Sequence, residues 1–117
     1  MQTDKILIDA LSGLELPINR VAAKYRTVEV LPEQYFIYSI TGGTASYGDD
    51  YLENIQMQYA IMLFSKNDYS DILHRTIAAL NTGNITIQSF GAEFYDPDID
   101  FYQIQINVSV FEDWEES

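Results

Sequence analysis

The most regular alternation of apolar and polar residues in this sequence lies near its end, from Tyr102 to Val110. Each even-numbered residue of the stretch is apolar, and each odd-numbered residue is Gln, Asn or Ser. A period of two gives an extended strand one apolar face and one polar face. We therefore predict a strand over 102–110. The rest of the chain is expected to cover its apolar face, and its uncharged polar face suits contact with water or with another protein.

Two further strands and a long hairpin are predicted in the middle of the chain. Residues 35–41 are rich in β-branched and aromatic residues, and residues 54–64 alternate at first and are then apolar on both faces. Both patterns are typical of strands. The segment 42–53 between them (GGTASYGDDYLE) is polar, acidic and contains several glycines. We expect the strands to pair as a hairpin, with 42–53 as a flexible tip that projects from the sheet.

Two helices are predicted from apolar residues spaced three and four apart. Asn67 or Asp68 can cap the better-defined helix, which is expected to pack on the apolar face of 102–110. Its apolar stripe consists of Tyr69, Ile72, Leu73, Ile77 and Leu80. The other helix is predicted near the N-terminus, with Thr3 or Asp4 as its cap. Its apolar side carries Leu7, Leu11 and Leu14.

Shorter features complete the predicted fold. Leu16–Ile18 is predicted as an extended piece at a sheet edge, because Pro17 has no backbone N–H to donate. Residues 19–34 are expected to form a long surface loop, which could include a brief strand at 27–30. A strand over 85–95, broken at Gly91, leads through the turn Asp96-Pro97-Asp98 into the final strand. The acidic tail 112–117 is expected to be loose.

These elements predict an α+β fold, with two helices packed on a mainly antiparallel sheet and a long projecting hairpin tip. A chain of 117 residues is expected to form one domain, 1–117. It contains no cysteine, which excludes disulfides and thiolate metal sites. The apolar residues near the N-terminus are interrupted by Asp4 and Asp9, so we expect neither a signal peptide nor a membrane span.

The net charge says more about possible binding partners than the length of the chain does. Eighteen acidic residues against six basic ones give a net charge of −12, which argues against nucleic-acid binding. The excess can serve solubility alone, or it can form a surface that lets DNA pass without holding it. Three of the six bases, Arg20, Lys24 and Arg26, fall within seven residues. This basic cluster is a candidate docking patch for an acidic neighbour, such as another copy of the chain.

No pattern in the sequence predicts catalysis, a cofactor or a metal site. Asp96, Asp98 and Asp100 alternate as in a calcium loop, but Phe101 stands where that loop requires glycine. His74 is the only histidine and lies off the apolar stripe, so we interpret it as a surface residue rather than a general base.

The predicted tip carries the other candidate residues. Asp49 and Asp50, with Glu53 close by, could bind a cation, but a solvated tip is the preferred interpretation. Tyr47 and Tyr51 are difficult to bury on such a tip and are candidate interface anchors.

The order of several short segments resembles the tail terminator family of long-tailed bacteriophages, whose members are also called tail completion or head–tail joining proteins. The segments are Tyr47-Gly48-Asp49-Asp50, the strand end Ile61–Lys66, the helix from Asp68-Tyr69, Gly91–Asp98, the strand Tyr102–Phe111, and the N-terminal helix followed by Leu16-Pro17-Ile18. Residues 20–34 do not align with the family pattern, so the role of the basic cluster is left open.

The resemblance implies a structural, non-enzymatic subunit of the virion, made in the host cytoplasm. It would assemble with copies of itself into a ring, typically a hexamer, at the head-proximal end of the tail. There it would bind the tail tube protein, stop tube growth and present a surface to the head–tail connector protein, while DNA passes through the lumen without specific binding. A neighbouring connector component, an acidic adaptor or inhibitor of a basic partner, and a small enzyme using His74 are the alternatives.

Overall fold

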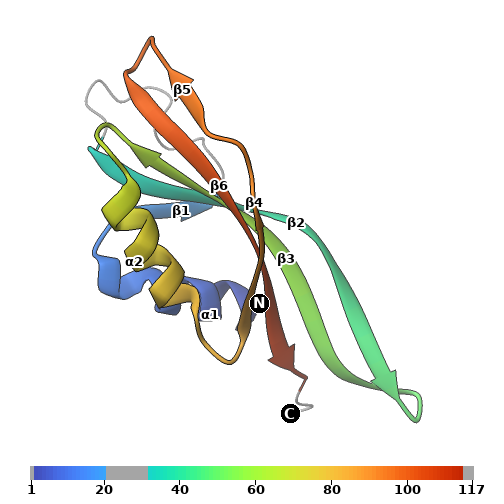
Figure 1. Ribbon diagram of the computed structural model, residues 1–117. Coiled ribbons are helices and arrows are strands. Elements are labelled where there is room, and N and C mark those ends of the chain that lie inside the picture. Colours follow the sequence, from blue (N-terminus) through green and yellow to red (C-terminus); the bar gives the residue numbers. More distant parts are fainter. Residues whose placement is uncertain (1, 21–31, 115–117) are drawn as a thin grey trace.

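A six-stranded sheet with two helices on one face makes up the part of the chain that the computed structural model describes, residues 2–20 and 32–114 (Figure 1). Its helical elements are α1 (Gln2–Leu11), the short 3-10 helix η1 (Ser12–Leu14) and α2 (Ser70–Leu80). Its strands are β1 (Ile18–Arg20), β2 (Gln34–Gly48), β3 (Tyr51–Ser65), β4 (Ile85–Phe90), β5 (Phe94–Asp96) and β6 (Phe101–Asp113). The predicted α+β fold with a mainly antiparallel sheet is confirmed.

The strands follow the order β1-β2-β3-β6-β4, and β5 pairs with β6 on the same side as β4. Only β1 and β2 are parallel; the other pairs within the described ranges are antiparallel. The three-residue β1 closes one edge, where the N–H of Phe36 donates to the carbonyl of Pro17 at 2.8 Å. The expected edge position of this proline-containing segment is therefore confirmed, although the strand itself begins at Ile18.

Strand β6 lies inside the sheet, between β3 and the β4–β5 edge, and its alternation is as predicted. Ile106, Val108 and Val110 on its apolar face are completely buried. The opposite face is more buried than the sequence predicted, because Ser109 is only 2% exposed. The strand also runs past the predicted boundary to Asp113 and buries Glu112, so the acidic tail is ordered at least that far.

Both helices cover the same face of the sheet (Figure 1). Leu7 and Leu11 of α1 join Ile72 and Leu80 of α2 in one core with the apolar face of β6. Helix α1 makes the closer approach to β6, whereas α2 packs on α1 and β4. The predicted packing of α2 on the apolar face of β6 is confirmed, although α1 shares that face and approaches β6 more closely.

The stripe and caps of the helices differ from prediction at single residues. The buried face of α2 consists of Ile72, Thr76 and Leu80, while Ile77 is only half-buried and lies outside the core. Thr76 is accommodated because its hydroxyl donates to the carbonyl of Ile72 at 2.6 Å. Asp68 does accept the N–H of Ser70 at 3.0 Å, as a residue near the helix start should.

Strands β2 and β3 form one long hairpin that continues to a two-residue turn (Figure 1). The predicted break at residue 42 was wrong, because cross-strand pairs continue from Gly42 opposite Gln58 to Gly48 opposite Tyr51. The glycines allow a close approach rather than a loop: a Cβ atom on Gly43 would lie 2.5 Å from Sδ of Met57. Register shifts beside Thr41 and Glu53 mark two bulges along the hairpin.

Candidate interaction surfaces

The hairpin tip is the first candidate surface. Asp49 and Asp50 form its turn with φ angles of 50° and 70°. Two consecutive positive φ values are typical of the tight turns whose twist matches that of the flanking strands, and Asp tolerates this conformation. Tyr47 and Tyr51 flank the turn, and each is 68% exposed. The structure therefore brings together all four of the tip residues predicted from the sequence, on a strand end rather than on a loop.

The basic cluster is described only at Arg20; Lys24 and Arg26 lie outside the described residues. Arg20 ends β1, opposite Tyr38 of β2, and its guanidinium lies 3.5 Å from a carboxylate oxygen of Asp4. Ten residues of β2 separate Tyr38 from Gly48, which corresponds to about 33 Å along a strand. Arg20 and the hairpin tip are thus separate surfaces within one subunit.

Asp4 also belongs to a polar cluster that ties α1 to the sheet. The buried hydroxyl of Tyr59 on β3 donates to Asp4 and lies 2.8 Å from the Thr3 hydroxyl. Burial, with the hydrogen bond to Asp4, raises the pKa of Tyr59. Thr3 and Asp4 were predicted as helix caps, but the helix already begins at Gln2, and their side chains instead bind the sheet.

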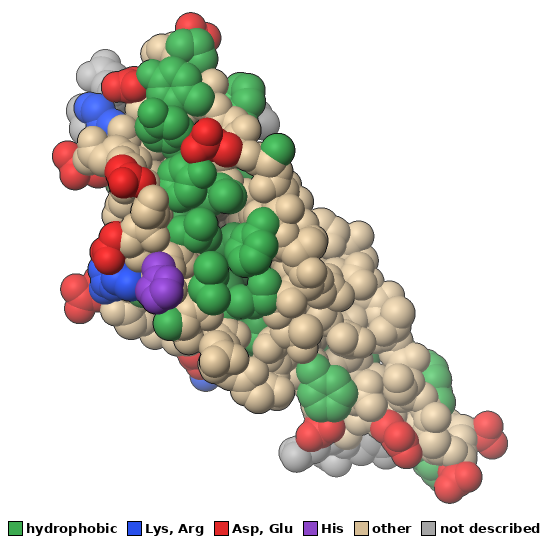
Figure 2. Space-filling model, viewed as in Figure 1, with side chains coloured by type: hydrophobic (Ala, Val, Ile, Leu, Met, Phe, Trp, Pro, Cys, Tyr) green, Lys and Arg blue, Asp and Glu red, His purple; other side chains and the backbone are tan. Residues whose placement is uncertain are grey.

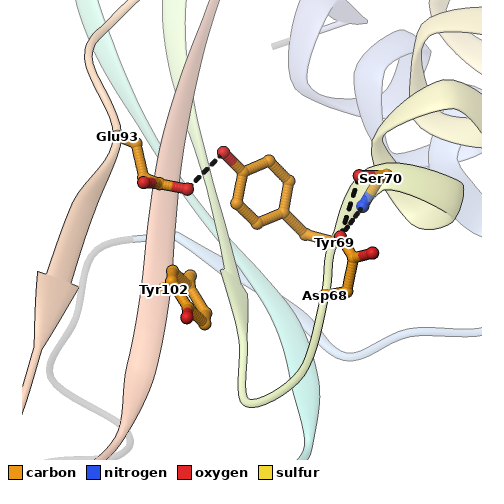
Figure 3. A pocket seen from close by; sticks show the side chains of 5 residues that line it. All are labelled: Asp68, Tyr69, Ser70, Glu93 and Tyr102. Carbon is orange, nitrogen blue, oxygen red and sulfur yellow. Dashed lines mark hydrogen bonds between the residues drawn. The ribbon is translucent and has the colours of Figure 1, made fainter.

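A pocket at the other end of the sheet was not predicted. We call it the tyrosine–carboxylate pocket; it has a volume of about 390 Å³. Its lining residues are Asp68, Tyr69, Ser70, Glu93 and Tyr102 (Figure 3). They come from the start of α2, the link between β4 and β5, and β6, which are distant in the sequence.

Hydrogen bonds and ring contacts hold the pocket in shape. The Tyr69 hydroxyl donates to Oε1 of Glu93 at 2.6 Å, as Figure 3 shows. Asp68 accepts both the N–H and the hydroxyl of Ser70 through Oδ1, which lowers its pKa. The hydrogen bond to Glu93, with a smaller effect of burial, raises the pKa of Tyr69 to about 12. The pocket thus places the carboxyl groups of Asp68 and Glu93 beside the rings of Tyr69 and Tyr102.

Sequence patterns gave little sign of this pocket. Tyr69 and Tyr102 were assigned to the apolar faces of a helix and a strand, and Glu93 to a short strand. The exposed apolar side chains of this end of the sheet were not predicted either: Phe90 and Ile99 are 49% and 41% exposed, and Phe94, on the opposite face from Tyr102, is 55% exposed. A signal was present in the density of aromatic residues between 90 and 102, which exceeds what one half-covered edge strand needs.

Other candidate chemistry finds no support from geometry. His74 is an exposed residue of α2 without a hydrogen bond or ion pair to any described residue. Asp49, Asp50 and Glu53 do not form a cluster that could hold a metal ion, nor do any other three His, Cys, Asp or Glu side chains of residues 2–20 and 32–114. Neither described helix has the length and apolar character needed to span a membrane.

No protein-family model matches the sequence, and no curated protein matches it either. Solved structures with a similar fold do exist. One of them aligns over 99% of this chain and 96% of its own length, with a TM-score of 0.57 and 10% sequence identity. Its name is a sequence identifier that describes no function. At this identity the likeness extends to the fold alone.

Proposed function

We propose that this chain is a structural subunit of a phage virion that caps the head-proximal end of the tail tube as a ring of six copies, the number typical of the family that it resembles. The observation that carries the proposal is the β2–β3 hairpin. Its buried side chains end at Tyr38 and Tyr59, and the strands continue well past them to exposed tyrosines. A long arm with aromatic residues at its end suits contact between subunits.

Two further features support this role. The order of segments that resembles the tail terminator family runs through nearly every described element, from α1 to β6. The net charge of −12 suits a ring through which DNA passes without binding, because like charges repel. In this role the partners are other copies of the chain, the tail tube protein and the head–tail connector protein, and the subunit is found in the virion after synthesis in the host cytoplasm.

A stop codon in the gene, within the phage or prophage that encodes it, tests the proposal. Electron microscopy of the lysate is expected to show overlong tail tubes beside filled heads that carry no tail. Tails of normal length left unjoined would instead assign the chain to the neighbouring connector. Normal infectious particles would contradict the proposal.

The acidic surface also supports a second candidate function, an adaptor or inhibitor that binds a basic partner protein. The same net charge of −12 carries this alternative. Pull-down experiments with the purified chain distinguish the two, because a terminator retains assembled tail tubes and an adaptor retains basic host proteins. An unchanged phenotype of His74→Ala would exclude the enzymatic alternative.

A further inference from the structure

The tyrosine–carboxylate pocket carries negative charge that the described part of the chain does not balance. Each carboxylate has one oxygen engaged: Oε1 of Glu93 by Tyr69, and Oδ1 of Asp68 by Ser70. Within residues 2–20 and 32–114, Oε2 of Glu93 and Oδ2 of Asp68 have no hydrogen-bond partner, and neither residue has a Lys or Arg partner. The free oxygens are therefore available to a cation from outside.

Aromatic rings line the same pocket. The ring of Tyr102 lies 6.1 Å from that of Tyr69 on one side and 4.9 Å from that of Tyr95 on the other, measured between ring centres. Both neighbouring rings are tilted against Tyr102, by 58° and 50°. The electron-rich faces of tyrosine rings attract cations, and arginine is the most frequent partner in proteins.

Apolar side chains extend the pocket into a larger surface. Tyr95 packs on Tyr102, its cross-strand partner, and Ile99 lies in the turn between β5 and β6. Figure 2 shows hydrophobic side chains gathered over β5 and along the seam between α2 and β4, with acidic side chains at the margin. An apolar surface around a charged pocket fits a protein partner better than a small free cation, which would leave that surface exposed.

We propose that the tyrosine–carboxylate pocket binds an arginine side chain presented by a different protein. The guanidinium lies against a tyrosine ring and donates to the free oxygen of Glu93, while Asp68, at the other end of the Tyr69 side chain, adds negative charge to the pocket (Figure 3). Its flat shape and several N–H groups match the face of one tyrosine ring and a neighbouring carboxylate, whereas a lysine ammonium is a compact point charge. A different, basic protein is favoured over a second copy, because a copy could present its basic cluster here only against the repulsion of its own net charge of −12. The inference does not depend on a role in phage tails.

An NMR titration of the isotope-labelled full chain with the peptide acetyl-Gly-Arg-Gly-amide tests this. We expect the arginine peptide to shift the amide resonances of Asp68–Ser70, Glu93 and Tyr102, and added salt to weaken the effect. The citrulline peptide has nearly the same shape without the charge and should shift none of them. The lysine peptide should bind more weakly than the arginine peptide.

A test variant and a control variant, each of which removes one negative charge, show whether the peptide binds at the pocket. Glu93→Gln is expected to weaken arginine-peptide binding about threefold, the effect typical of an exposed ion pair. Asp49→Asn removes one charge at the far end of the hairpin and should leave binding unchanged. Equal weakening by both variants would overturn the assignment of the pocket.

Other outcomes would overturn particular parts of the inference. Equal binding of the citrulline peptide, or no shift with any peptide, would refute a cation site. Lysine binding as tight as arginine binding would refute the stacking of a guanidinium. Pocket resonances that shift with protein concentration alone would show that a second copy is the occupant. Because the titration uses the isolated chain, its failure is distinguishable from a normal phenotype of the stop-codon phage.

Discussion

At the scale of single residues, the polar cluster around Tyr59 shows why a tyrosine stands on a core-facing position. The ring of Tyr59 is 1% exposed and fills space in the core, while its hydroxyl reaches Thr3 and Asp4 of α1. A phenylalanine would fill the same space but would remove the hydroxyl that Thr3 and Asp4 contact. The hydroxyl therefore orients α1 on the sheet.

Tyr59→Phe is expected to lower the free energy of unfolding by about 1 to 2 kcal/mol, the cost of removing a buried hydroxyl from its partners. Chemical denaturation measures the change. Tyr47→Phe makes the same substitution at an exposed site and should change stability by less than about 0.5 kcal/mol. Equal effects of the two substitutions would show that the cluster contributes nothing.

The tyrosine–carboxylate pocket predicts how stability responds to alkaline pH. Folding raises the pKa of Tyr69 from 10.0 to about 12 through its hydrogen bond to Glu93. The native state therefore keeps a proton that the unfolded state loses, so this stabilisation is present below pH 10 and is lost as the pH rises towards 12. Unfolding titrations at several alkaline pH values should show a steeper loss of stability in the natural chain than in Tyr69→Phe. Parallel pH profiles would contradict this.

At the scale of elements, the sequence predicted helix α2 and its apolar side correctly but did not predict which residues form the centre of its buried face. Five apolar residues marked the stripe, yet the buried line runs through Ile72, Thr76 and Leu80 and leaves Ile77 half-buried. The polar Thr76 could not be recognised as a core residue from its type. Its hydroxyl donates a hydrogen bond within the helix, so its burial costs little free energy.

Alanine substitutions in α2 test this orientation. Leu80→Ala should cost about 3 kcal/mol of unfolding free energy, because Leu80 is completely buried and its loss leaves a cavity. Ile77→Ala should cost about 1 kcal/mol, since much of that side chain already contacts water. Urea denaturation compares the two. A larger effect at Ile77 would mean that the helix is rotated.

The hairpin is the element on which the proposed assembly depends. Replacing Tyr47 and Tyr51 by serine is expected to leave folding intact, because both side chains are 68% exposed, and to prevent ring formation. Sedimentation velocity and thermal denaturation measure assembly and folding separately. Replacing both tyrosines by phenylalanine keeps the aromatic side chains and should restore assembly. Rings that form normally from the serine variant would remove the tip from the interface.

At the scale of the whole molecule, charge and shape act together. The described part of the chain measures 54 × 28 × 24 Å, and much of its length is the hairpin (Figure 1). An elongated subunit with a net charge of −12 repels its own copies unless the contacts between them place bases against acids. The basic cluster is the densest set of bases available for that purpose.

Reversing Arg20, Lys24 and Arg26 to glutamate is therefore expected to block assembly while the subunit still folds. The ion pair between Arg20 and Asp4 is long, at 3.5 Å, and its Arg20 side chain is 55% exposed, so it contributes less than about 1 kcal/mol. Reversing Lys5, Lys66 and Arg75 changes the net charge equally and is the matched control, expected to assemble better. Native mass spectrometry and circular dichroism measure assembly and folding. Identical assembly of both variants would exclude a specific role of the cluster.

The sequence alone determined the type of most elements, apart from the ends of β2 and β3 that were predicted as a flexible tip. Alternation over Tyr102–Val110 and the stripe of α2 reflect local geometry, which repeats every two or 3.6 residues and is readable without knowledge of the fold. The turn at Asp96-Pro97-Asp98 follows from local chemistry as well, and the structure confirms it with the Asp98 N–H donating to Asp96 at 3.0 Å. The two acidic residues at the hairpin turn were also placed correctly.

Only the tertiary structure decided how these elements meet. The hairpin continues through its glycines because each strand supplies the other's hydrogen bonds, a gain that composition does not reveal. The tyrosine–carboxylate pocket joins Tyr69, Glu93 and Tyr102 across 33 residues of sequence, since β6 folds back between β3 and the β4–β5 edge. Such a site depends on side chains from separate elements, and its residues have no common local pattern. Periodicity therefore predicts faces, and packing decides which faces become sites.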